Sequence, residues 1–239
     1  MTNDLLIAIG LTAAAAVVIG ALSASVPAPA RTRIGFAAVL AAWFSVAVFL
    51  GATGVLAPEH LGTPAVGAAV ALPIVAIAWL ASRWPVLRNA LLGIPVPVLI
   101  GVNTVRMLGF FFVALYAQGR LPEPFAPIAG WGDIAIGLTA LPVAWLVARQ
   151  AGAWRPTALS WNLLGLADLI VAVSLGVMSA PDSPFRVFTE GPSTSAMAAL
   201  PMFIVPGFLV PLLVLTHLAV FYRLSAPAQA NETLRTVQA

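Results

Sequence analysis

The chain of 239 residues contains no cysteine and no lysine. Without cysteine, disulfide bonds, thiolate metal sites and thiol nucleophiles are excluded. Without lysine, retinal has no amine with which to form a Schiff base, so a covalently bound retinal is excluded. No other cofactor is predicted.

Charged residues are also scarce. They make up 8% of the chain, against 61% hydrophobic residues, whereas a typical soluble domain has about 25% charged residues. Such a chain cannot cover a water-facing surface and must face lipid instead. The net charge of +3 comes from arginines that form no basic cluster interleaved with aromatic residues, so nucleic acid is not an expected partner.

Seven long apolar stretches divide the chain, and each approaches or exceeds the roughly 20 residues that a helix needs to cross a bilayer. These stretches are residues 4–25, 34–56, 64–82, 94–118, 125–148, 157–180 and 198–222. The sequence therefore predicts an all-α fold, a polytopic bundle of seven transmembrane helices in one domain over residues 1–223. Residues 224–239 are polar and aperiodic, which predicts a disordered cytoplasmic tail.

The arginines are sorted by loop. Eight of the eleven follow the first, third, fifth and seventh stretches, namely Arg31, Arg33, Arg83, Arg88, Arg149, Arg155, Arg223 and Arg235. Cytoplasmic loops retain Lys and Arg, so this alternation predicts an N-terminus outside and a C-terminus in the cytoplasm. The alanine-rich, lysine-free composition is typical of a protein from a GC-rich bacterial genome, which predicts a multi-pass protein of the inner (plasma) membrane.

Charged side chains inside the apolar stretches are candidate functional residues, because they are expensive in lipid and face the interior of a bundle. Arg106 lies midway along the fourth stretch, with Asn103 three residues earlier on the same face. Asp168 lies near the middle of the sixth stretch, so Arg106 and Asp168 are expected to meet at one depth. Asp133, in the fifth stretch, lies nearer the outer end but within reach of the long arginine side chain.

One arginine and two aspartates leave a net charge of −1 if all are ionised. The charge count therefore predicts one aspartate that is ionised and paired with Arg106 and another that is protonated near neutral pH. Such a setting suits the binding of a proton or a small molecule. The alternative is a structural Arg–Asp pair that only fixes helix packing.

Three further residues are candidates for the same region. His217 and Asn162 lie at similar depth near the inner ends of their helices and are expected to bond to each other. Trp161 lies seven residues before Asp168 on the same helical face, where it is expected either to close a pocket below the aspartate or to pack in the core. The second histidine, His60, lies in an outer loop, so no metal site is predicted.

Three functional hypotheses remain open. The first is a proton-linked transporter or channel for a small molecule or ion, with its polar site formed by Arg106, Asp133 and Asp168. The second is a membrane-embedded enzyme that uses the two carboxylates on an amphiphilic substrate. The third is a non-catalytic accessory or sensor subunit. An enzyme acting wholly in water is disfavoured, because no segment has the length and composition of a soluble domain.

Overall fold

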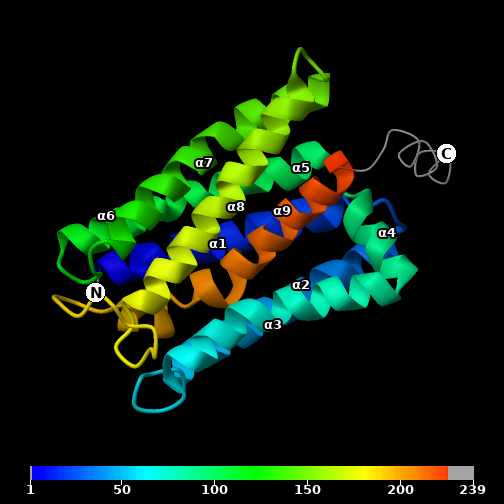
Figure 1. Cartoon of the computed structure of the whole chain (residues 1–239). Helices are drawn as coiled ribbons and strands as arrows, with labels where there is room; N and C mark the ends of the chain where they lie inside the picture. Colours follow the sequence, from blue (N-terminus) through cyan, green and yellow to red (C-terminus); the bar gives the residue numbers. More distant parts are fainter. Residues whose placement is uncertain (1, 226–239) are drawn as a thin grey trace.

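The structure is a computed structural model that describes residues 2–225. Over these residues the chain folds into a bundle of helices, whose longest connection follows α8 (Figure 1). The first half contains α1 (Thr2–Ala24), α2 (Ala30–Thr53), α3 (Gly62–Arg83), α4 (Pro85–Gly93) and α5 (Val96–Gly101). The second half contains η1 (Val102–Gly109), α6 (Phe110–Ala117), α7 (Phe125–Arg149), α8 (Trp154–Met178), η2 (Thr194–Ala198), η3 (Val205–Leu209) and α9 (Val210–Ser225).

Seven helical segments within residues 2–225 are long and apolar enough to cross a membrane. Five of them are the single helices α1, α2, α3, α7 and α8. The other two are composite, formed by α5, η1 and α6 over Val96–Ala117 and by η3 and α9 over Val205–Ser225. A helix satisfies its own backbone hydrogen bonds, which lipid cannot do. The protein is therefore a multi-pass membrane protein with an all-helical bundle.

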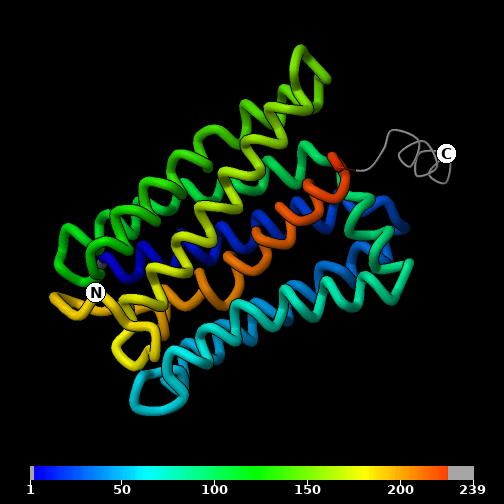
Figure 2. The backbone as a smooth tube through the Cα atoms, viewed as in Figure 1, coloured from blue at the N-terminus to red at the C-terminus, as the bar shows by residue number. Residues whose placement is uncertain are grey.

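Successive spans run in opposite directions, so the connections alternate between the two ends of the bundle. The beginning of α1 lies at the same end as the loops 54–61, 118–124 and 179–204 (Figure 2). The connections 25–29 and 150–153, helix α4 and the last turn of α9 lie at the opposite end. Seven of the eight arginines that sort by loop in the sequence thus gather at this second end, which we call the arginine-rich end; the eighth, Arg235, lies outside the described residues.

The loops at the opposite end carry Glu59, Glu123, Asp182 and Glu190, so we call it the acidic end. Two arginines, Arg120 and Arg186, also lie there. Arg120 Nη2 forms an ion pair with Asp4 Oδ1 at 2.8 Å and so connects the start of α1 to the end of α6. Arg186 donates to backbone carbonyls of its own loop, including those of Phe188 at 3.3 Å and Pro181 at 3.4 Å. Both exceptions to the charge pattern therefore have local partners.

The fourth span differs from the uninterrupted helix expected over residues 94–118. Its central eight residues, Val102–Gly109, adopt 3₁₀ geometry between the short helices α5 and α6. The stretch before it was expected to be a loop, but Pro85–Gly93 forms the additional helix α4. Pro85 begins α4 at a position where its missing N–H leaves no bond unmade.

The seventh span begins later than expected. Residues 198–222 were predicted to be one helix, but the segment starts at Val205 with a π-helical turn that leads into α9. Pro211 has no N–H to donate to the carbonyl of Gly207, four residues earlier. Trp43 Nε1 on α2 donates to that carbonyl at 3.0 Å instead. At its other end α9 continues to Ser225, beyond the predicted start of the tail at residue 224; residues 226–239 lie outside the described residues.

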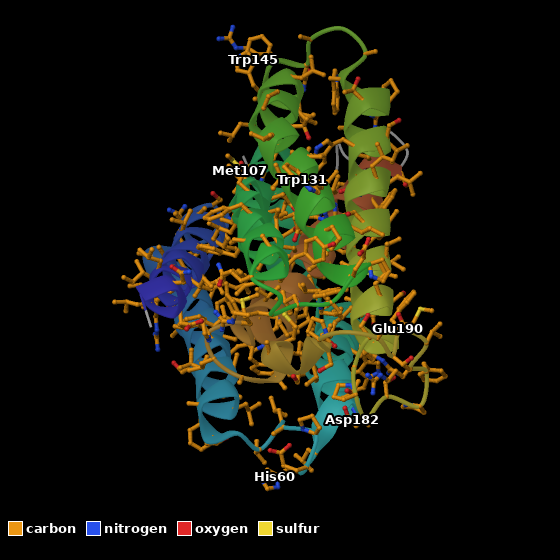
Figure 3. The ribbon with its side chains drawn as sticks, turned by 90° about the vertical axis from the view of Figure 1, so that its left-hand side faces the viewer. His60, Met107, Trp131, Trp145, Asp182 and Glu190 are labelled. Atoms are coloured by element: carbon orange, nitrogen blue, oxygen red, sulfur yellow. The ribbon has the colours of Figure 1, made fainter. Side chains whose placement is uncertain are left out.

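Helix α7 lies at the centre of the most closely packed part of the bundle, where it contacts α5, η1, α6 and α8. Helices α2 and α3 lie on the other side of the molecule. Figure 3 shows α2 and α3 separated from each other and joined by the loop that carries His60. The π-helical turn η3 contacts both of them. Helix α3 also contacts α9. The bundle thus places one densely packed side next to a side that is largely open to lipid.

Candidate functional site

The site is centred on Arg106, in the 3₁₀ segment at the middle of the fourth span. A 3₁₀ helix has three residues per turn, so residues three apart lie on one face. Asn103, Arg106 and Gly109 follow this spacing and all three are buried. Runs of 3₁₀ helix longer than three or four residues are uncommon. Here the segment turns the arginine, which is 4% exposed, into the bundle.

Glycines on α7 and η1 bring the two backbones into direct contact. A Cβ atom on Gly137 would lie 2.5 Å from the amide nitrogen of Met107 and 3.0 Å from the carbonyl carbon of Arg106. A Cβ atom on Gly109 would lie 2.6 Å from Cβ of Asp133 and 2.7 Å from the carbonyl oxygen of Gly130. Small residues at helix interfaces allow this close approach in membranes. The close contact places Asp133 directly beside the arginine.

The Arg106 guanidinium contacts two carboxylates and a carbonyl from two helices. Its Nε donates to Asp133 Oδ1 at 2.6 Å, its Nη2 donates to Asp168 Oδ2, and its Nη1 donates to the carbonyl oxygen of Gly165 at 3.0 Å. The arginine side chain is 2% exposed, whereas those of Asp133 and Asp168 are 14% and 15% exposed. All three charged residues expected to meet therefore do so, and we call them the Arg–Asp cluster.

His217 and Asn162 continue the polar contacts on the far side of the arginine. His217 Nε2 lies 3.5 Å from Arg106 Nη1, and its Nδ1 lies 2.8 Å from Asn162 Oδ1. An amide oxygen can only accept and a guanidinium nitrogen can only donate. These contacts fit a neutral imidazole that carries its proton on Nδ1. Asn162 Nδ2 in turn donates to the carbonyl oxygen of His217 at 3.1 Å, so the expected bond between the two residues is present and reciprocal.

Gly165 makes room for this arrangement on α8. A Cβ atom at this position would lie 2.6 Å from Cε1 of His217 and 3.4 Å from Nη1 of Arg106. The absence of a side chain lets the imidazole and the guanidinium reach the backbone of α8, where Nη1 finds the carbonyl of Gly165. The sequence marks Gly165 as a small residue three positions before Asp168, but it does not indicate that its carbonyl is a ligand of the arginine.

Trp161 and Asn103 take different places from the other candidates. Trp161 Nε1 donates to Thr139 Oγ1 at 2.9 Å, and its ring centroid lies 5.6 Å from that of His217. Trp161 packs against the histidine ring. It lines neither of the two cavities described below, both of which reach Asp133. Asn103 Nδ2 donates to the carbonyl of Leu99 at 3.0 Å, while its Oδ1 is buried without a hydrogen bond from residues 2–225. Asn103 shares a face with Arg106 but does not bond to it in this part of the chain.

Two cavities reach the cluster, and the sequence indicates neither. The larger, about 100 Å³, lies between α3 and α8 and extends from the acidic end of the bundle down to Asp133; we call it the α3–α8 cavity. The smaller, about 40 Å³, lies on the α1 side and is lined by both Arg106 and Asp133. Asp133, Phe112, Leu169, Val205 and Val210 line both, so they form the wall between the two spaces.

The mouth of the α3–α8 cavity is closed on one side by a contact between a loop and a helix. Asp182, in the loop after α8, accepts hydrogen bonds from the amide nitrogen of Thr63 at 2.6 Å and from Thr63 Oγ1 at 2.5 Å. Burial alone would raise the pKa of the Asp182 carboxyl, but these hydrogen bonds hold that pKa below its ordinary value. Gly62 has φ of +59°, and a side chain there would collide with Asp182. The contact thus fixes the first turn of α3.

Over residues 2–225 the structure contains no group of three or more His, Cys, Asp or Glu side chains that could hold a metal ion. The ionisable groups that meet at the site are two carboxylates, one guanidinium and one imidazole. These groups can hold a proton or an ion in a low-dielectric setting, where a charge needs a compensating partner.

The chain was compared with known proteins. No curated protein and no solved structure matches it. One family model does match, over residues 63–225, a range that begins at the first turn of α3 and includes every residue of the Arg–Asp cluster. The chain belongs to the family described as "Domain of unknown function (DUF8737)".

Proposed function

We propose that the protein is a proton-linked transporter of a small molecule, and that the Arg–Asp cluster is its proton-binding site. The observation that carries this proposal is the unequal count of buried charges: one guanidinium faces two carboxylates. An uncompensated charge in a low-dielectric interior is strongly unfavourable. The second carboxylate therefore needs a proton or a cation as its partner, and exchange of that partner couples the site to proton binding.

We further propose that the protein lies in the bacterial inner membrane with its arginine-rich end in the cytoplasm. Cytoplasmic loops retain arginine, and seven of the arginines in residues 2–225 lie at this end. The α3–α8 cavity then opens toward the outside. His217 and Asn162 lie on the opposite side of Arg106 from Asp133, on the side that leads toward the cytoplasm. The cluster thus separates an outer cavity from an inner polar pair, as the central site of a transporter does.

The proposal is tested by the charge movement that follows a rapid pH jump. Purified protein is reconstituted into liposomes, and the proteoliposomes are adsorbed to a solid-supported membrane on an electrode. Proton binding at a carboxylate part-way across the membrane displaces charge and gives a transient current. We expect this current in the wild type and expect Asp133→Asn to remove it, because the amide cannot take up the proton.

Glu190→Gln is the matched control, since Glu190 is an acidic residue of an exposed loop at the same end of the bundle (Figure 3). It should leave the current unchanged. A wild-type response equal to that of empty liposomes, or an undiminished current in Asp133→Asn, would contradict the proposal. In that case the cluster would be a structural pair. A sustained current in place of a transient one would indicate a channel.

A further inference from the structure

We propose that the α3–α8 cavity binds an amphiphilic monocation, a small apolar molecule with one ammonium group, whose charge takes the place of the proton at Asp133. This inference rests on the proposed function and names the class of substrate that the site takes. The shape and lining of the cavity support this inference, as does the charge at its inner end.

The cavity combines an apolar wall with one charged group at depth. Its polar side chains other than Asp133 are Thr63, Asp182, Thr194 and Ser195, all at the acidic end. Between this mouth and Asp133 the walls are apolar: they consist of small and aliphatic residues of α3 and α8, with Phe112 of α6, Phe125 of α7 and residues of η3 and α9. The volume of about 100 Å³ is of the same order as an apolar cavity that takes up benzene. A ligand that fits has an apolar body about the size of a phenyl ring.

The charge at the inner end favours a cation over an anion. Each nitrogen of the Arg106 guanidinium already contacts a protein acceptor: Asp133, Asp168 or the carbonyl of Gly165. Arg106 also does not line the α3–α8 cavity, so an anionic ligand there would meet the Asp133 carboxylate rather than the guanidinium. Asp133 differs, because Arg106 engages only its Oδ1, and no donor from residues 2–225 reaches its Oδ2. Because Asp133 lines the cavity and is 14% exposed, an ammonium group can reach this free oxygen.

Charges at the mouth support the same sign of ligand. The two loops at the mouth carry Asp182, which lines the cavity, and Glu59, which follows the lining residue Pro58. Arg120 is paired with Asp4, and Arg186 donates to backbone carbonyls of its own loop. A cleft lined by one sign of charge raises the local concentration of ions of the opposite sign. A cation therefore meets a favourable potential at the entrance and an unoccupied carboxylate oxygen at the inner end, with apolar walls between the two.

Exchange of the ligand for a proton follows from the charge balance. When Asp133 holds a proton, the cluster is neutral; when an ammonium group binds the carboxylate, the proton leaves and the cluster is neutral again. No covalent bond forms in this exchange. Binding of the cation should therefore release a proton, and the apparent affinity should rise with pH by up to about tenfold per pH unit where one proton is exchanged.

The test uses three probes of similar shape and different charge on full-length protein in detergent: 2-phenylethylammonium, 2-phenylethanol and phenylacetate. Calorimetry gives the affinities, and a pH-indicator dye in weak buffer gives the protons released. We expect 2-phenylethylammonium to bind at least about tenfold more tightly than the alcohol, the value of one charge-assisted hydrogen bond. Its binding should release about one proton per molecule under conditions where Asp133 is protonated.

Two pairs of variants locate the site. Asp133→Asn should remove the preference for the cation and the proton release, whereas Glu190→Gln should keep both. Val173→Phe fills the cavity and should abolish binding of the cation. Val171→Phe places the same ring two residues away on the lipid-facing side of α8, where Val171 is 44% exposed, and should leave binding unchanged.

The inference is overturned if the ammonium and the alcohol bind equally to the wild type, if phenylacetate binds most tightly, if Asp133→Asn keeps the preference for the cation over the alcohol, or if the cation still binds to Val173→Phe. Its failure is distinguishable from failure of the proposed function. Without cation binding, a pH-jump current in the wild type would leave proton exchange standing and exclude only this substrate class. Loss of that current as well would exclude both.

Discussion

Helices α7 and α3 are similar in length and apolar character but differ in how they are packed. Helix α7 has 25 residues, of which ten are buried, while α3 has 22 residues, of which only Gly62 is buried. On α7, glycines allow backbone contact with η1, and a charged side chain finds its partner there. On α3, the small residue Gly67 meets no neighbour and instead borders a cavity. Close packing in this bundle therefore accompanies the buried charges.

The largest loss in the free energy of unfolding is expected when both carboxylates on the packed side are removed. The double variant Asp133→Asn, Asp168→Asn leaves Arg106 buried without a counter-charge. Removing the partner of a buried charge destabilises a protein by about 3–5 kcal/mol. We expect a loss of this order in the free energy of unfolding, measured by titration with a denaturing detergent. Each single variant keeps one carboxylate on the arginine and should lose much less.

A smaller effect is expected when one methyl group is added on each side. In Gly137→Ala the new Cβ meets the backbone of Met107 and Arg106, which cannot move away as a flexible side chain would. Overpacking of this kind costs about 1–3 kcal/mol. Gly67→Ala on α3 is the matched control, because no atom lies within 4 Å of its Cβ, and it should change stability by less than about 0.5 kcal/mol. Equal losses would remove the distinction between the two sides.

The connection between the two sides can be weakened at Trp43. Its Nε1 donates to the carbonyl of Gly207, to which Pro211, four residues later, has no N–H to donate. Trp43→Phe keeps an aromatic ring but removes the N–H, so we expect a loss of about 1 kcal/mol in thermal or denaturant unfolding. The variant Pro211→Ala, which restores an N–H for Gly207, should reduce that loss when combined with it. Additive effects would show that the two residues do not act on the same carbonyl.

The smallest effect is expected at the mouth of the α3–α8 cavity. Because hydrogen bonds from Thr63 hold the pKa of Asp182 below 3.8, its contribution to stability is present above that pH and is lost as the pH falls below it. Relative to the intrinsic exchange rate of an unprotected amide at each pH, the first turn of α3 should therefore lose protection from hydrogen exchange at acid pH while α7 keeps its protection. Asp182→Asn should show this loss of protection at neutral pH. An unchanged α3 in this variant would show that the contact does not hold the helix.

Much of the bundle is predictable from apolarity alone. A run of about 20 apolar residues identifies a span whether or not it packs against the protein, so α3 and α7 are found equally well. The meeting of Arg106 with Asp133 and Asp168 is also predictable, because depth in an antiparallel bundle follows from counting residues along each helix. The bond between His217 and Asn162 follows from the same counting.

Other features depend on tertiary contacts that leave little local signal. Nothing in the residues around Arg106 distinguishes a 3₁₀ segment from an α-helix. The cavity lies in a gap between α3 and α8, and no sequence pattern marks such a gap. The predicted seventh span contains Pro201, Pro206 and Pro211, which are typical of a bent helix but do not indicate where that helix begins. The direction of the termini across the membrane stays a prediction from the arginine pattern.

The most direct measurement is the thermal stability of the detergent-purified protein against pH, for the wild type, Asp133→Asn and Asp168→Asn. Raising the pH withdraws the proton that balances the second carboxylate and leaves an uncompensated buried charge, so the wild type should lose stability with rising pH. Replacing one aspartate by asparagine makes the cluster neutral, and Asp133→Asn, which removes the proposed proton-binding carboxylate, should keep its fold and lose that pH dependence. If both variants unfold and neither alters a pH dependence, the Arg–Asp cluster is a structural pair and proton exchange at this site is refuted.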